Sequence, residues 1–268
     1  MDQKTKAAAF GALHTGGDIL ILPNAWDAAS AAVMADAGAK AVATSSAAVA
    51  WAHGFPDGDL LPLPLLLQTI EAVARVVAVP VTADIEGGYT DDLYRLGETI
   101  RAVIGVGAVG INLEDGRRDP DLHVRKIEAA RKAADAAGVA LFINARTDVY
   151  LKDLAEGHAA YVETTQRAER YRAAGASGIF VPGPSDSDLI GRLADVIKLP
   201  LNIMLLPGLP KAEQLQALGV RRVSSATAPF RAAYATVAKA TAAFLQDADP
   251  SAFAASAEGL GNLNKRFE

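Results

Sequence analysis

The chain has 268 residues and no cysteine, which excludes disulfide bridges, thiolate metal sites and cysteine nucleophiles. Its four histidines show no spacing typical of metal ligands. Gly, Pro or charged residues interrupt every apolar run before the roughly 18 residues that a membrane-spanning helix needs. The formal net charge of −5 disfavours nucleic-acid binding, which requires a basic face. Residues 1–4 lack the start of a signal peptide, so we expect a cytoplasmic protein without membrane or nucleic-acid partners.

Hydrophobic residues make up 51% of the sequence, enough to bury a large core. Short apolar segments alternate with longer amphipathic segments about eight times, and the apolar segments are continuous, as in strands buried on both faces. The predicted strands are 18–22, 40–44, 79–84, 109–114, 140–145, 178–182, 200–205 and 220–225. Predicted helices include 27–37, 64–77, 91–105, 121–137 and 160–174.

Several predicted helices end in a glycine just before the next strand: Gly38, Gly107, Gly138, Gly175 and Gly219. This arrangement is typical of the loops of a repeated βα unit. Eight such units predict an α/β fold of the (β/α)₈ TIM-barrel type; a doubly wound open sheet is the alternative, but even spacing favours closure. We find no linker and expect one domain over 1–268, with the barrel core at 18–235.

Two segments flank the predicted barrel. Residues 4–14 are expected to form an N-terminal helix that plugs its bottom. Residues 228–258 are Ala-rich and read as helical, and we assign 236–268 to a C-terminal helical extension. Its surplus apolar surface indicates a subunit contact in a homo-oligomer, a dimer or tetramer, although packing on the same barrel is an equal alternative.

Carboxylates gather at the predicted strand exits, which converge at one end of a barrel. Asp84 and Glu86 follow the third strand, and Glu114 ends the fourth. Hard carboxylate oxygens around a small polar pocket suit Mg²⁺ or Mn²⁺. The sequence therefore predicts a divalent-cation site.

An anion site is expected beside these carboxylates. Small residues at 45–48 let backbone N–H groups approach a carboxylate, and Arg146 can bind a second acidic group in a bidentate way. A 2-oxo acid presents a carboxylate beside a carbonyl and fits this pattern. Two alternatives are structural: Arg146 paired with Asp148, and Asp115 paired with Arg117 or Arg118.

No lysine occupies a predicted strand exit, since Lys40 begins one strand and Lys198 precedes another. A Schiff-base mechanism is therefore poorly supported. No Gly-rich loop follows the last two strands, so a sugar phosphate has no clear binding site.

The residues at the strand exits resemble the isocitrate lyase/phosphoenolpyruvate mutase superfamily over residues 18–235. The matching segments are Pro23–Asp27, Thr44–Ala47, Gly54–Asp57, Ala83–Tyr89, Asn112–Asp115 and Asn144–Asp148. The resemblance implies that Asp84 binds Mg²⁺ directly, while Asp57, Glu86 and Glu114 bind it largely through water.

The same resemblance implies the remaining roles. Substrate-binding candidates are Trp26, Ser45, Ser46, Ala47, Asp84, Arg146 and Asn202, and catalytic candidates are Arg146 and Glu114. Trp26 also reads as a packing residue. Members of the superfamily are typically tetramers that exchange a C-terminal helix between subunits, so we expect the extension to be helix-swapped.

The chain departs from the superfamily after the fourth predicted strand. Lyases carry a cysteine-containing loop there and mutases a longer gating loop, whereas here a helix begins soon after Gly116. The usual cleavage of isocitrate is therefore doubtful, and so is phosphoryl mutation. Arg117, Arg118 and His123 are candidate proton donors, or simply charges at a helix start.

We therefore predict an enzyme, a Mg²⁺-dependent lyase that cleaves or decarboxylates a small 2-oxo or 2-hydroxy acid such as oxaloacetate through a pyruvate-like enolate. A phosphonomutase or phosphonopyruvate hydrolase is the first alternative. A non-catalytic 2-oxo acid binding protein is the second.

Overall fold

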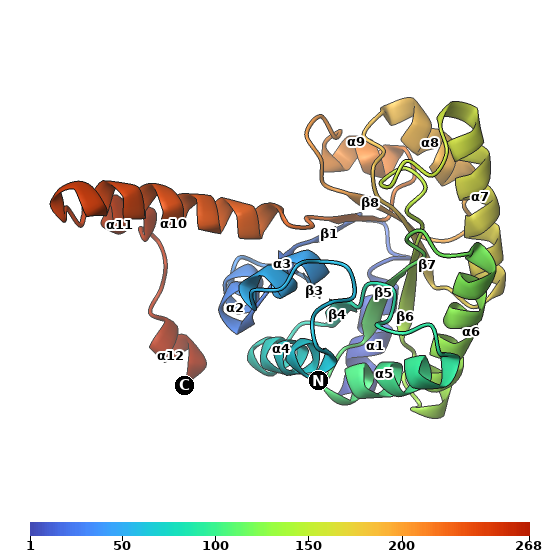
Figure 1. Cartoon of the computed structure of the whole chain (residues 1–268), viewed down its shortest axis with the longest axis horizontal. Coiled ribbons are helices and arrows are strands. Elements are labelled where there is room, and N and C mark those ends of the chain that lie inside the picture. The colour runs from blue at the N-terminus through green and yellow to red at the C-terminus, as the bar shows by residue number, and fades with distance from the viewer.

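The computed structural model covers residues 1–268 (Figure 1). Its strands are β1 Leu20–Leu22, β2 Asn24–Ala25, β3 Val42–Thr44, β4 Val81–Asp84, β5 Gly110–Glu114, β6 Phe142–Arg146, β7 Gly178–Val181, β8 Leu201–Met204 and β9 Arg222–Ser224. Its helices are α1 Gln3–Ala12, α2 Ala28–Asp36, α3 Ser46–Ala52, α4 Leu63–Val76, α5 Leu93–Gly105, α6 Pro120–Ala136, α7 Gly157–Ala173, α8 Ser187–Val196, α9 Ala212–Ala217, α10 Ala228–Asp247, α11 Ser251–Ser256 and α12 Leu263–Phe267.

All neighbouring strands pair in parallel, in the order β1-β9-β8-β7-β6-β5-β4-β3-β2. The strands β1 and β2 are two halves of one strand, interrupted at Pro23, and they pair with β9 on one side and β3 on the other. Proline has no N–H to donate to a ladder, which explains the break. The sheet thus closes into the predicted (β/α)₈ barrel.

The strand and helix predictions agree with the structure to within about three residues at each end, the usual ambiguity of element boundaries. The five glycines expected at helix C-termini all have positive φ, between 67° at Gly138 and 106° at Gly107. Three helices lack a predicted counterpart: the seven-residue α3 at the exit of β3, α8 and the short α9.

The N-terminal helix α1 covers the bottom of the barrel, as predicted. Phe10 is fully buried, and its ring lies 5.5 Å edge-on from Phe142 at the start of β6. The ring of His14 stacks on Phe142 at 3.9 Å. These contacts leave the opposite end, where the strands finish, as the open end.

The C-terminal segment does not pack as a barrel helix. Helix α10 extends away from the barrel as an arm, with α11 folded back along it (Figure 1). Residues 228–258 are helical as predicted, with one break: α10 ends at Asp247, Ala248 has a left-handed φ of 60°, and α11 begins after Pro250. The chain then returns to the barrel, where Arg266 pairs with Asp36 of α2 at 2.8 Å.

None of the helices combines the length and the apolar character needed to cross a bilayer.

Candidate active site

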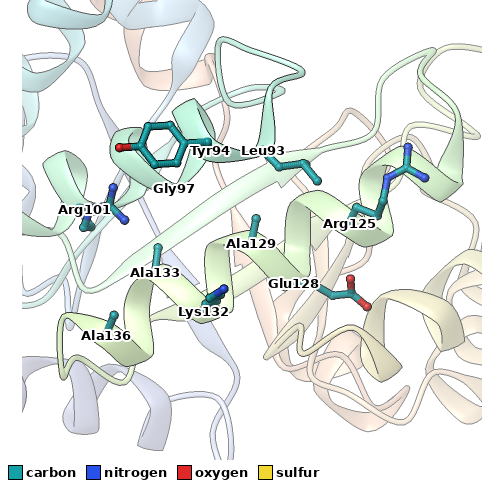
Figure 2. A pocket seen from close by; sticks show the side chains of 10 residues that line it. All are labelled: Leu93, Tyr94, Gly97, Arg101, Arg125, Glu128, Ala129, Lys132, Ala133 and Ala136. Carbon is teal, nitrogen blue, oxygen red and sulfur yellow. The ribbon is translucent and has the colours of Figure 1, made fainter.

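A cavity of about 220 Å³ lies at the open end of the barrel, where parallel barrels place their reaction sites. Its 14 lining residues include Asn24, Ser45, Ser46, Ala47, Asp57, Asp84, Asn112, Arg146, Phe180 and Ser224. A larger hollow of about 580 Å³ lies outside the barrel between α5 and α6 (Figure 2). None of the predicted site residues lines that outer hollow, so the smaller cavity is the candidate site.

One wall of the cavity is the start of α3. Strand β3 ends at Thr44, and Ser45 then caps the helix by accepting a hydrogen bond from the backbone N–H of Ala48. Ser46 and Ala47 occupy the first turn, whose N–H groups have no acceptor within a helix. The structure therefore brings Ser45, Ser46 and Ala47, which were predicted to hold a carboxylate, to the cavity wall. The backbone N–H groups of Ser46 and Ala47 are free to donate there.

Arg146 lines the cavity at the end of β6. Its Nη1 pairs with Glu114 at 2.8 Å and its Nε with Asp148 at 2.6 Å, which leaves Nη2 without a protein partner. Burial lowers the pKa of Arg146, but the two carboxylates raise it above its ordinary value, so the guanidinium stays charged. Arg146 thus forms the structural ion pair with Asp148 that the sequence offered as an alternative, and it also presents a positive charge to the cavity.

Two of the four predicted metal ligands, Asp57 and Asp84, line the cavity. Asp84 ends β4, and its backbone N–H donates to Thr44 Oγ1 at 2.9 Å. Burial raises the pKa of Asp84 to about 7, although Arg146 and a hydrogen bond from the backbone N–H of Glu86 both act to lower it. A desolvated carboxylate beside an exposed one suits a divalent cation that keeps several waters, as Mg²⁺ does.

The other two predicted ligands are engaged by the protein. Glu86 Oε2 accepts the backbone N–H of Gly58 at 2.7 Å and that of Asp59, while Oε1 accepts from the hydroxyl of Tyr89 at 3.0 Å. Glu114 pairs with Arg146. No three acidic or histidine side chains converge closely enough to form a preassembled metal cluster.

Lys152 lies beside the site without lining the cavity, which the sequence did not predict. Its Nζ lies 3.3 Å from Glu114 Oε1 and 3.1 Å from Asp148 Oδ2, so a lysine does reach this end of the barrel. Burial lowers its pKa, but Glu114 and Asp148 raise it above its ordinary value, and Lys152 is a cation here. Asp148 and Lys152 are joined by a single backbone turn, in which the Lys152 N–H donates to the Asp148 carbonyl at 2.9 Å, and no periodic pattern in the sequence marks it.

Trp26 and Asn202 do not line the cavity. The Trp26 ring packs edge-on against Phe230 of α10 at 5.3 Å. Asn202 is buried below the cavity and accepts a hydrogen bond from Ser224 Oγ at 3.3 Å. The lining residues Leu151, Phe180, Met204 and Thr227 were not predicted, because apolar and loop residues carry no chemical signal in a sequence.

The candidate proton donors lie away from the cavity. His123 is buried against Tyr171 at 4.6 Å, and burial, with Lys126 and Arg118 nearby, lowers its pKa to about 3, so it is neutral. Arg117 is exposed and donates to the carbonyl of Lys152 at 2.9 Å. The structural alternative in which Asp115 pairs with Arg117 or Arg118 was wrong, since Asp115 pairs with Arg167.

Asp115 instead joins three elements beneath the site. It accepts from Arg167 Nη1 at 2.8 Å, from the hydroxyl of Tyr171 at 2.7 Å and from the backbone N–H of Asp148 at 2.9 Å. The loop after β5 is thereby tied to α7 and β6.

Comparisons with known proteins place the chain among relatives of known family. The family model for phosphoenolpyruvate phosphomutase matches residues 10–245. An uncharacterized protein of Mycobacterium tuberculosis is 35% identical over 88% of each chain. An oxaloacetate decarboxylase of Pseudomonas entomophila is 30% identical over 84% of this chain and 80% of that enzyme. A Burkholderia cenocepacia protein provisionally assigned as a phosphonomutase superimposes with a TM-score of 0.84 at 44% identity, over 87% of this chain and 98% of that one.

Proposed function

Because the chain belongs to the phosphoenolpyruvate phosphomutase family, and with it to the isocitrate lyase/phosphoenolpyruvate mutase superfamily of enzymes, we propose that it is a Mg²⁺-dependent lyase. Its substrate would be a small 2-oxo or 2-hydroxy acid, broken down through a pyruvate-like enolate. Decarboxylation of oxaloacetate is the leading case, and a relative of 30% identity carries that name.

One observation carries the proposal: a small cavity holds free helix N–H groups, an arginine and two acidic side chains together. The volume of about 220 Å³ limits the substrate to a few carbons. The N–H groups of Ser46 and Ala47 would bind the carboxylate next to the 2-oxo carbon. The guanidinium of Arg146 would bind the second acidic group and stabilise charge that develops on the substrate.

Asp84 and Asp57 would hold the cation, Asp84 directly and Asp57 through water. When bound, Mg²⁺ would polarise the 2-oxo group. Glu114 would keep Arg146 in position through their 2.8 Å ion pair, which places Glu114 in a supporting role. Phe180, whose ring centroid lies 5.7 Å from the guanidinium carbon of Arg146, would exclude water from that side.

A phosphonate substrate is the second candidate, favoured by the structural relative of 44% identity. Arg146 would then bind the phosphonate group, since a guanidinium suits phosphate-like oxygens as well as carboxylates.

The test is release of pyruvate from oxaloacetate, 2-methylisocitrate and phosphonopyruvate, with Mg²⁺ or with EDTA. We expect Mg²⁺-dependent release from oxaloacetate above the background of the metal alone, abolished by EDTA and by Asp84→Ala. Turnover of phosphonopyruvate alone would favour the second candidate. Equal activity of Asp84→Ala and wild type would refute the proposed site.

A further inference from the structure

A cluster of charged residues that includes Asp59 lies outside the cavity, next to Glu86 and Gly87. Asp59 Oδ1 accepts the backbone N–H groups of Gly87 at 3.1 Å and Tyr89 at 3.2 Å. Its own backbone N–H donates to Glu86, and its Oδ2 pairs with Arg118. One aspartate thus joins the loop that carries Asp57 to the end of β4 and to the short loop after β5.

Arg118 is itself held in place. Its Nε donates to Asp91 at 3.1 Å, and Asp91 also accepts from Lys126 Nζ at 2.5 Å. The side chain of Lys126 is fully buried and donates to the carbonyl of Gly87 at 2.8 Å. The ion pairs run continuously from Lys126 of α6 through Asp91 and Arg118 to Asp59, and the two ends contact Glu86 and Gly87.

The backbone at this contact is strained. Six non-glycine residues in the chain have positive φ, and three of them are Asp59 at 61°, Glu86 at 50° and Tyr89 at 62°. Such conformations cost free energy and persist where surrounding contacts enforce them. Here the hydrogen bonds of Asp59 link all three residues.

Gly87 fits the same arrangement. A Cβ atom at this position would lie 2.6 Å from Cζ of Arg118, so the guanidinium packs directly on the glycine backbone. Any larger residue would displace Arg118.

We propose that Asp59 and Arg118 form a clasp that positions the loop bearing Asp57 against Glu86, and so keeps the cation and substrate cavity assembled without a long gating loop. The inference rests on the proposed function for its chemistry: both are positioning residues, since neither lines the cavity. The clasp itself is a property of the fold, which can be measured without turnover.

The first test is hydrogen–deuterium exchange of residues 54–60 in Arg118→Met and Arg117→Met. Both variants remove one charge from the same loop, but Arg117 makes no contact with Asp59 and donates only to the carbonyl of Lys152. We expect exchange about tenfold faster in Arg118→Met, unchanged exchange in Arg117→Met, and unfolding midpoints within about 3 °C of wild type. Equal exchange in the two variants would overturn the proposal.

Two further variants separate the clasp from a general loss of structure. Gly87→Ala should reproduce the faster exchange by displacing Arg118 with no change of charge, and Arg118→Lys should restore part of the protection. Asp59→Asn keeps the acceptor for Gly87 and Tyr89 and tolerates a left-handed φ. Combined with Arg118→Met it should exchange no faster than Arg118→Met alone, whereas additive effects would contradict a shared pair.

The consequence for the site is measured with Mn²⁺ as the probe, by its electron paramagnetic resonance signal. We expect Arg118→Met to bind Mn²⁺ about tenfold more weakly and to raise KM for the substrate more than it lowers kcat. If wild type turns over no 2-oxo acid, the proposed function fails, yet the exchange contrast still decides the clasp. Unchanged Mn²⁺ affinity would overturn the positioning role.

Discussion

At the residue scale, Arg146 has two tasks that substitution can separate. Lysine at position 146 keeps the positive charge beside Glu114 and Asp148 but loses the planar fork that binds an acidic group in a bidentate way. We expect Arg146→Lys to lower kcat/KM on the order of a hundredfold and to cost about 1 kcal/mol of stability. Steady-state kinetics with urea unfolding checks this, and a variant retaining more than half of wild-type kcat/KM would contradict it.

Asp84 gives a pH dependence of defined sign. Its pKa is raised from 3.8 to about 7 by burial, so the folded state holds this proton more tightly than the unfolded state does. The protonated Asp84 therefore contributes its full share to the free energy of unfolding below about pH 4. As the pH rises to about 7 the carboxyl ionises, and the free energy of unfolding falls by roughly 2–4 kcal/mol. Asp84→Asn cannot ionise and should not show this loss in urea unfolding with EDTA between pH 5 and 8.

Mg²⁺ should reverse that loss in wild type, because the cation binds the ionised carboxylate. The stabilisation by Mg²⁺ should therefore increase as the pH rises through 7 and be absent in Asp84→Asn. The same pH profile in both proteins would show that Asp84 is not the titrating group.

At the element scale, Asp115 shows how the short loop after β5 is fixed. Removal of its carboxylate leaves Arg167, with a side chain 9% exposed, without its 2.8 Å partner. We expect Asp115→Ala to lower the free energy of unfolding by about 3 kcal/mol, as breaking a buried ion pair does. Tyr171→Phe removes only one neutral hydrogen-bond donor to Asp115 and should lower it by about 1 kcal/mol. Urea unfolding measures both, and equal losses would show that the charge contributes nothing extra.

The elements themselves could be predicted from the sequence, because buried parallel strands and glycine-terminated helices leave strong local patterns. The exits of these strands also predicted that Ser45, Asp84 and Arg146 would line one cavity. Apart from the ion pair of Arg146 with Asp148, the side-chain partners could not be predicted. Lys152 reaches Glu114 through a turn, and Glu86 accepts from the Gly58 loop, since such contacts depend on loop paths that no periodicity encodes.

At the scale of the whole molecule, the barrel lacks the helix that should cover β1 and β9. An apolar hollow of about 400 Å³ lies there, lined by Ile21, Met34, Leu205 and Val223 among others. Helix α10, which would normally fill it, leaves the barrel with Tyr234, Val237 and Phe244 each more than 40% exposed. The sequence left open whether this extension packs on its own barrel; in this chain α10 does not, whereas α12 returns to α2 through Arg266.

We therefore expect a homo-oligomer in which α10 of one chain covers the hollow of another. Light scattering after size exclusion should give a mass above the 27.8 kDa of a single chain. The double variant Ile21→Asp, Val237→Asp places charges on both apolar surfaces and should give the mass of a single chain. Lys239→Asp on the same helix is the control, since Lys239 is already polar. A monomeric wild type at micromolar concentration would contradict this expectation.

The pairing of the first strand with the last has a consequence for synthesis on the ribosome. Leu20 pairs with Arg222, so the barrel cannot close until nearly the whole chain has left the exit tunnel. Until then β1 and β8 are open edges that can pair with strands of other nascent chains. Slow translation through residues 200–222 would lengthen this exposure, so chaperone demand should depend on codon choice in that stretch more than on the stability of the finished enzyme.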